Sequence, residues 1–105
     1  MSAAIVQSET ATYSRWVRRM AKDRRLFATH ISLYTALFIC WQKHGFSQPF
    51  QICRRELMVF SKIASIATYQ KCIKELNSYG YIHYIPSYHP KLGSQVYWPA
   101  AAGEI

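Results

Sequence analysis

The sequence predicts one α+β domain, with a core of three helices and a small antiparallel sheet. Three observations predict it: an amphipathic segment with a capping residue and a glycine stop, a shorter helical segment before it, and an alternating segment with proline and glycine after it. With 105 residues, of which 50% are hydrophobic, the chain can bury one core. We expect a flexible leader at 1–11, a basic amphipathic arm or helix at 12–25, the folded domain at 26–99 and a tail at 100–105.

The expected basic arm combines an apolar stripe with many positive charges. Tyr13, Trp16 and Met20 recur at helical spacing, and six basic residues and one acid lie between Arg15 and Arg25. Three interpretations remain open. The segment is a helix that packs Trp16 and leaves its arginines in solvent, an arm that contacts phosphates, or a helix on a membrane surface.

The next helix is expected from a cap at Thr29 to Lys43, with Gly45 as its stop. Its apolar stripe is broad, which indicates a central helix covered on two sides. Because Ile39 falls outside that stripe, part of the helix is a candidate for contact with a second subunit. The candidate dimer interface consists of Tyr34, Phe38, Ile39 and Trp41.

A short strand at 50–52 and a short helix at 54–60 are expected after this helix. The strand alternates apolar and polar residues. The helix offers Leu57, Met58 and Phe60 to the core.

The helix expected at 66–79 is the best defined element. Ser65 is an N-cap, since its hydroxyl can accept from free backbone N–H groups of the first turn. Gly80 suits the left-handed position after the helix, and Tyr81 is expected to fold back on Leu76 in a Schellman-type closure. The face expected to be buried carries Tyr69, Cys72, Ile73 and Leu76.

A hairpin is expected to follow, with arms at 81–85 and 94–98 and a loop at 86–93 that carries His89 and Lys91. Two helices joined by a tight turn and followed by a hairpin predict a winged helix-turn-helix fold.

The charge of the chain favours a polyanionic partner. Lys and Arg number 13 against 5 Asp and Glu, a formal charge of +8, which suits duplex DNA, RNA or an anionic membrane. Gln70 can pair with an adenine edge, and Lys71 or Lys74 can reach a guanine or a phosphate. The alternative is that these lysines only form a solvated face. The residues expected to contact DNA are Ser65, Ala67, Thr68, Gln70, Lys71 and Lys74 in the recognition helix, Arg54, Arg55 and Lys62 before it, His89 and Lys91 in the wing, and Arg15, Arg18 and Arg19 in the arm.

Enzyme chemistry finds little support, so we expect no catalytic residues and no cofactor. The five acids form no obvious carboxylate pair, and the four glycines form no phosphate loop. Cys40 and His44 have the i, i+4 spacing of metal ligands, with Cys53 as a third candidate, but the second close ligand pair of a zinc site is missing. We therefore expect neither a metal nor a small-molecule ligand.

The sequence predicts a soluble, cytoplasmic protein. Three cysteines fit no disulfide framework, and the N-terminus carries no signal peptide. The longest apolar run, 31–41, is well short of the ~20 residues that a membrane span needs.

Residues 61–82 and the hairpin after them resemble a known family. The segments SKIAS, TYQKCIKEL and YGYI, with the Tyr- and Pro-rich loop that follows, are similar to winged-helix domains of bacterial replication-initiation and transcription-factor proteins. The nearest resemblance is to primosomal DnaD-type N-terminal domains and small winged-helix proteins of mobile elements. It implies a three-helix, three-strand fold and either DNA binding or self-association. Ile66 and Ala67 depart from the polar residues usual at the start of a base-reading helix.

The leading hypothesis is thus a non-enzymatic protein that binds double-stranded DNA in replication, recombination or transcription of a mobile element or phage. It would use a recognition helix at 66–79 and a wing at 86–93. The alternative is a protein-interaction or oligomerisation module without sequence-specific DNA readout. Such a module would form a homodimer or bind a protein partner. RNA binding would use the same charges.

Overall fold

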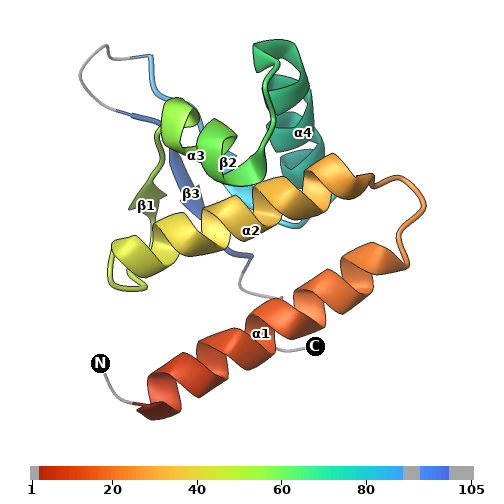
Figure 1. The fold of residues 1–105 in the computed structure, drawn as a ribbon. Helices are drawn as coiled ribbons and strands as arrows, with labels where there is room; N and C mark the ends of the chain where they lie inside the picture. The colour runs from red at the N-terminus through yellow and green to blue at the C-terminus, as the bar shows by residue number, and fades with distance from the viewer. Residues whose placement is uncertain (1–2, 89–92, 100–105) are drawn as a thin grey trace.

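The order of elements is α1 (Ala3–Ala21), α2 (Ala28–Lys43), β1 (Phe50–Gln51), α3 (Arg54–Ser61), α4 (Ile66–Ser78), β2 (His83–Ile85) and β3 (Gln95–Tyr97) (Figure 1). The structure, a computed structural model, describes residues 3–88 and 93–99, with side chains from residue 8 onward in those ranges. In these residues the chain forms an α+β domain, as the sequence predicted. None of the described helices has the length and apolar character needed to cross a membrane.

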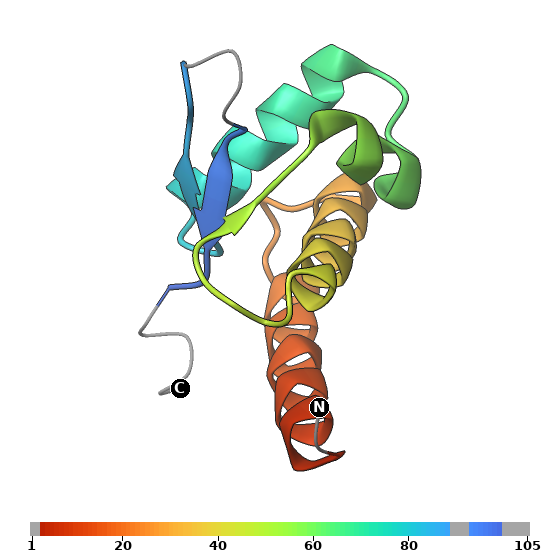
Figure 2. The ribbon, with the colours of Figure 1, turned by 90° about the vertical axis from the view of Figure 1, so that its left-hand side faces the viewer.

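The three strands form one antiparallel sheet in the order β1-β3-β2 (Figure 2). Val96 of β3 lies in the middle, opposite Phe50 of β1 and Tyr84 of β2. The Ile52 N–H donates to the Ser94 carbonyl at 2.9 Å and extends the β1–β3 pairing. The first strand therefore joins a hairpin that follows it by more than thirty residues in the sequence.

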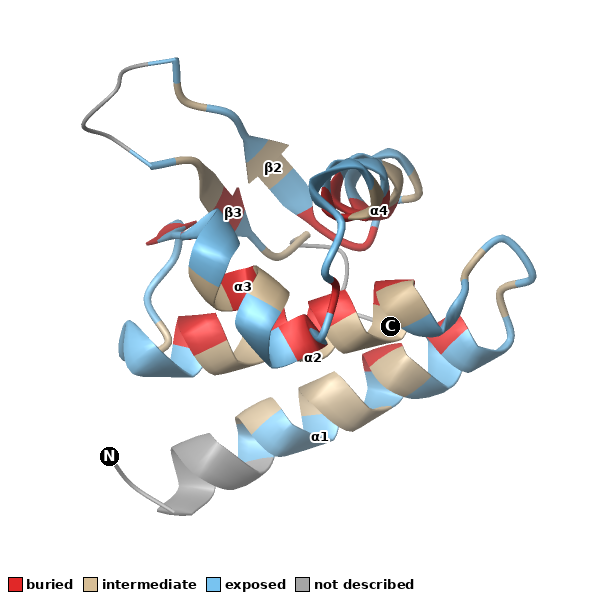
Figure 3. Ribbon diagram, turned by 45° about the horizontal axis from the view of Figure 1, so that its top comes forward, coloured by how far each residue is buried: buried red, intermediate tan, exposed pale blue. Residues whose placement is uncertain are grey.

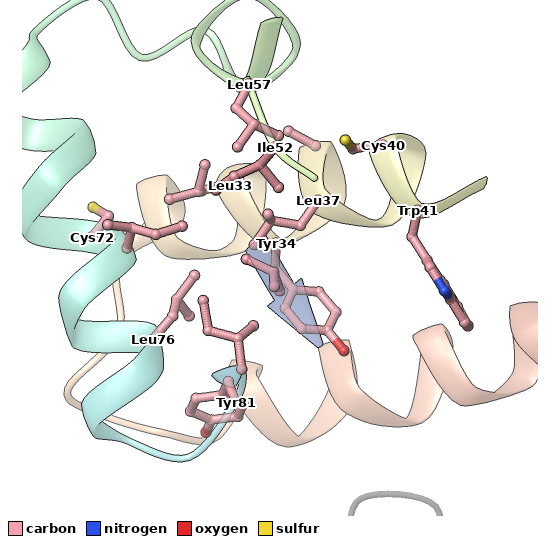
Figure 4. Packing of buried hydrophobic residues seen from close by; sticks show 14 of the residues in the cluster. Leu33, Tyr34, Leu37, Cys40, Trp41, Ile52, Leu57, Cys72, Leu76 and Tyr81 are labelled. Carbon is pink, nitrogen blue, oxygen red and sulfur yellow. The ribbon is translucent and has the colours of Figure 1, made fainter. Parts of the chain in front are cut away.

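Helix α2 lies at the centre of the domain, with α1 on one side and α3 and α4 on the other (Figures 1 and 2). Leu33 and Leu37 of α2, Leu57 of α3 and Leu76 of α4 are fully buried (Figure 4). Burying each such side chain contributes about 1.5–3 kcal/mol. The buried residues lie on the facing sides of these helices, and the outer side of α4 is exposed (Figure 3).

The predicted cap, glycine closure and buried face of α4 are confirmed. The Thr68 N–H donates to the Ser65 hydroxyl at 3.2 Å, so Ser65 is the N-cap. At the other end Gly80 has φ +85°, and the Tyr81 N–H donates to the Leu76 carbonyl at 2.9 Å. With the Gly80 N–H donating to the Asn77 carbonyl, this completes the Schellman motif. All four residues of the face predicted to be buried are buried: Tyr69, Cys72, Ile73 and Leu76.

Helix α1 differs from the prediction because it begins at Ala3, inside the expected leader at 1–11, and it ends at Ala21, inside the expected arm. Trp16 and Met20 are buried, and the hydroxyls of Tyr13 and Thr35 are hydrogen-bonded at 2.6 Å. These contacts dock α1 on α2. Since the segment between residues 3 and 21 contains no glycine or proline, a docked turn can propagate toward the N-terminus.

The start of α2 also differs from the prediction. Its N-cap is Phe27, and the Phe27 N–H donates to Nδ1 of His30 at 2.9 Å. Thr29 therefore does not cap the helix. Its hydroxyl instead accepts a weak hydrogen bond from Sγ of Cys72 at 3.5 Å.

One core prediction is wrong, and two residues of the candidate dimer interface are buried within the chain. Phe60 is 45% exposed, because α3 directs Leu57 and Ser61 inward and Phe60 falls outside that face. In the candidate dimer interface, Tyr34 and Trp41 are buried within the chain and Phe38 and Ile39 are half-buried. Tyr34 and Trp41 pack on Trp98, with ring centroids 5.2 and 5.5 Å apart, so the chain itself covers them.

Candidate nucleic-acid interface

The outer face of α4 carries the residues that the sequence predicted there. Ala67, Gln70, Lys71 and Lys74 are exposed, and Thr68 is half-buried. The opposite face is fixed in the core, so the helix cannot rotate these side chains inward. The exposed face is therefore a permanent feature of the fold.

A groove of about 600 Å³ lies beside this face, between α4 and the β2–β3 hairpin. It brings Arg54 of α3 together with Gln70 and Lys74 of α4, three residues that were predicted as one interface. Tyr84, Ser87 and Ser94 line the hairpin side. The predicted wing-tip residues His89 and Lys91 lie outside the described residues.

The groove is positive because no described carboxylate neutralises it. Of the four acids with described side chains, three are engaged elsewhere: Glu56 with Lys43 at 3.0 Å, Asp23 with Arg25 at 2.7 Å and Glu75 with His30 at 2.9 Å. Neither Arg54 nor Lys74 forms an ion pair with another described residue. Burial raises the pKa of Tyr69 to about 12, so this lining hydroxyl stays neutral at pH 7.

The remaining predicted cations near α4 are exposed but do not line the groove. Arg55 lies at the start of α3, and Lys62 lies in the turn between α3 and α4, where its φ is +63°. Lys71 lies on α4, close enough to Glu75 to help lower the pKa of that carboxyl. These three charges lie on α3, on α4 and in the turn between them.

The predicted arginines of the arm are not part of this site. Arg15, Arg18 and Arg19 are exposed on α1, which lies across α2 from α3 (Figures 1 and 2). The guanidinium of Arg19 lies 5.0 Å from the Trp16 ring centroid, a cation–π contact within the same helix. Among the described residues, the arginines of α1 and the cations of α3 and α4 therefore lie on separate surfaces.

Sequence reasoning missed an exposed apolar patch of Val59, Phe60 and Ile66, of which Val59 and Ile66 line one hollow with Arg54 and Arg55. Val59, Phe60 and Ile66 are 64%, 45% and 48% exposed. A helical wheel centred on Leu57 places Val59 on the far side, so that signal was available in the sequence. The patch stands beside the positive surface and requires its own explanation.

The cluster of His30, Cys72 and Glu75 was not predicted, and its ligand atoms lie within 4.8 Å of one another. Because Nδ1 of buried His30 accepts the Phe27 N–H, a neutral ring carries its hydrogen on Nε2 and donates it to Glu75 at 2.9 Å. A metal at Nε2 would have to displace that hydrogen bond. The His30 hydrogen bond lowers the pKa of Glu75, and the pair links α2 to α4 as a structural contact.

The zinc ligands considered from the sequence do not converge in the described residues. Sγ of Cys40 donates to the Gln51 carbonyl at 3.4 Å, and no described metal-capable cluster contains His44 or Cys53. Burial raises the pKa of Cys40 to about 11, so its thiol remains protonated at pH 7.

Comparison of the chain with protein-family models, with curated proteins and with solved structures found no match.

Proposed function

We propose that this chain is a winged helix-turn-helix module that binds double-stranded DNA without catalysing a reaction. The order helix, strand, helix, helix and hairpin, with the early strand added to the hairpin, supports the winged-helix assignment. One observation carries the DNA assignment. Arg54, Gln70 and Lys74 meet in a groove beside an exposed helix, and no described acid neutralises the two cations.

In this proposal α4 enters the major groove, which is wide enough to admit a helix. Gln70 contacts base edges, while Lys74 and Arg54 contact phosphates on either side of the groove. Ile66 and Ala67 at the start of α4 can touch only thymine methyl groups, so phosphate contacts dominate and sequence selectivity is low. Duplex RNA fits less well, because its major groove is too narrow for side chains to read. On the resemblance described above, we propose that this activity serves replication, recombination or transcription of a mobile element or phage, with the cytoplasm as the expected compartment.

The test is fluorescence anisotropy of a labelled, mixed-sequence DNA duplex across a salt series. Log affinity is expected to fall linearly with log salt. The slope would be about −4 to −5 if Arg54, Arg55, Lys62, Lys71 and Lys74 each neutralise one phosphate, at about 0.9 per phosphate. A duplex RNA of the same length is the competitor. The proposal is contradicted by a flat salt response or by no binding at low salt.

A second candidate is self-association, which the exposed patch of Val59, Phe60 and Ile66 favours. The two functions are expected to respond to salt concentration in opposite directions. It weakens phosphate contacts, whereas it screens the repulsion between two chains of charge +8 and so strengthens association. In light scattering, self-association predicts a dimer whose fraction rises with salt and falls in Val59→Ser. Ile85→Ser, at an exposed apolar position on β2, is the matched control. A monomer at all salt concentrations excludes this candidate.

A further inference from the structure

Helix α1 carries a stripe of positive charge on its exposed side. The cations recur at i, i+3, i+4 and i+7, the spacing that brings residues to one face of a helix. All of them are exposed, and we call them the α1 stripe: Arg15, Arg18, Arg19 and Lys22. The first three belong to α1, and Lys22 follows its last turn, where the Lys22 N–H donates to the Arg19 carbonyl at 3.2 Å. The backbone therefore holds these charges on one side of α1.

No described carboxylate neutralises the α1 stripe. Its members form no ion pair with a described residue. Asp23, the nearest acid in sequence, is bound by Arg25 and by the Tyr81 hydroxyl, each at 2.7 Å. Glu9 of α1 lines the cavity between α1 and α2 together with Trp16, so it belongs to the face that packs on α2. The positive charge of the stripe therefore remains available to a partner.

The helix dipole accounts for only part of the α1 stripe. Cations in the last turn of a helix interact favourably with the negative end of its dipole, and Arg18 and Arg19 lie in that turn. The effect falls off within one turn, so it does not explain Arg15. A stripe that extends beyond the last turn is better explained by a negatively charged partner.

The exposed side of α1 offers a partner charge but almost no apolar surface. Trp16 and Met20 are buried, and Tyr13 and Val17 are half-buried. The exposed residues from 8 to 21 are polar, basic or alanine: Ser8, Thr10, Ala11, Arg15, Arg18, Arg19 and Ala21. A helix on a membrane surface inserts large apolar side chains, and the centre of a protein interface is rich in them. The stripe therefore fits a phosphate backbone better than a membrane or a protein.

The α1 stripe and the groove lie on different sides of the domain. No residue of α1 lines the groove, and α2 lies between α1 and α3 (Figures 1 and 2). One duplex could contact both surfaces only by bending around a domain whose largest dimension is 36 Å, about one turn of DNA. Duplex DNA resists bending over about 150 bp. Two duplexes, one at each surface, need no such bend.

We propose that the α1 stripe binds the phosphate backbone of a second DNA duplex, so that one chain bridges two duplexes. This inference rests on the proposed function, because the first duplex occupies the groove. The stripe contacts phosphates alone and reads no sequence. The groove adds Gln70 to its cations and is therefore the tighter of the two sites.

Energy transfer between two short duplexes tests the bridge with the intact chain. The duplexes differ in sequence, and one carries a donor dye and the other an acceptor dye. Transfer is expected to rise as the chain is added at low salt and to fall again when the chain is in excess, because each duplex then carries its own copies. The signal should also decrease steeply with salt.

Two variants with the same change in net charge separate the surfaces. Arg15→Glu with Arg18→Glu is expected to raise the concentration of duplex needed for half-maximal transfer at least about 100-fold, while anisotropy still shows tight binding of one duplex. Arg54→Glu with Lys74→Glu is expected to lose transfer as well, because only the stripe remains. An equimolar mixture of the two variants should not restore transfer, since each chain then has one surface.

The outcomes distinguish this inference from the proposed function. Binding of one duplex with the expected salt slope, but no transfer at any ratio, overturns the bridge and leaves the groove as a DNA site. No binding of DNA at all overturns both. Transfer that persists in Arg15→Glu with Arg18→Glu, or that returns in the mixture, means that a dimer joins two grooves. Duplex RNA that suppresses transfer far better than the same amount of unlabelled DNA would assign the stripe to RNA instead.

Discussion

Replacing both Arg54 and Lys74 with glutamate is expected to lower affinity for duplex DNA at least about 100-fold at low salt. The two side chains line the same groove from α3 and α4, and neither is in an ion pair with a described residue. The change removes two phosphate contacts and places two negative charges at the phosphate backbone. A hundredfold loss corresponds to about 2.7 kcal/mol, which two such contacts can supply. Anisotropy titration measures it.

Stability is expected to change little in this variant, because both side chains are exposed. The matched control is Arg15→Glu with Arg18→Glu, which makes the same change in net charge on α1. An equal loss of affinity in the control would mean that the net charge of the chain, and not the groove, attracts DNA. Full affinity in the Arg54 and Lys74 variant would reject the groove as the site.

Trp16→Ala is expected to destabilise the domain by about 3–5 kcal/mol, a large share of the ~5–15 kcal/mol typical of a domain. Trp16 is buried, and its ring meets Tyr81 edge-on at 5.7 Å. The Tyr81 hydroxyl in turn donates to Asp23 at 2.7 Å, which ties the connection after α1 to the end of α4. Hydrogen bonds from Arg25 and Tyr81 hold the pKa of Asp23 well below its usual range, so this contact stays charged at neutral pH.

Urea unfolding of Trp16→Ala measures this loss. Arg15→Ala is the control, because it alters the neighbouring exposed position of the same helix and should change stability by less than about 0.5 kcal/mol. Unchanged stability in Trp16→Ala would restore the interpretation of α1 as an arm that is not part of the fold.

The contrast between α4 and α1 shows which features can be predicted from local sequence. In α4 the cap, the buried face and the glycine closure depend on residues within a few positions of one another. Helical period and backbone hydrogen bonding act over that range, so the pattern predicted them. The sequence before Tyr13 has a weaker helical pattern, and the extent of α1 depends on docking against α2.

The candidate site shows the same difference between features set by local sequence and features set by tertiary structure. The sequence predicted that Gln70 and Lys74 share an exposed face, because their spacing alone places them there. It also proposed one set of cations that included the arginines of α1, and the path of the chain around α2 separates them from the groove.

By itself, the sequence determined the α+β class, the cap and closure of α4 and its polar face, since each follows from neighbours along the chain. Only the tertiary structure decided that Tyr34 and Trp41 are covered by Trp98, that Phe60 is exposed, and that His30 meets Glu75. Those contacts join residues that are far apart in sequence. Their formation depends on which apolar surfaces bury one another when the whole chain folds, and local spacing does not specify that.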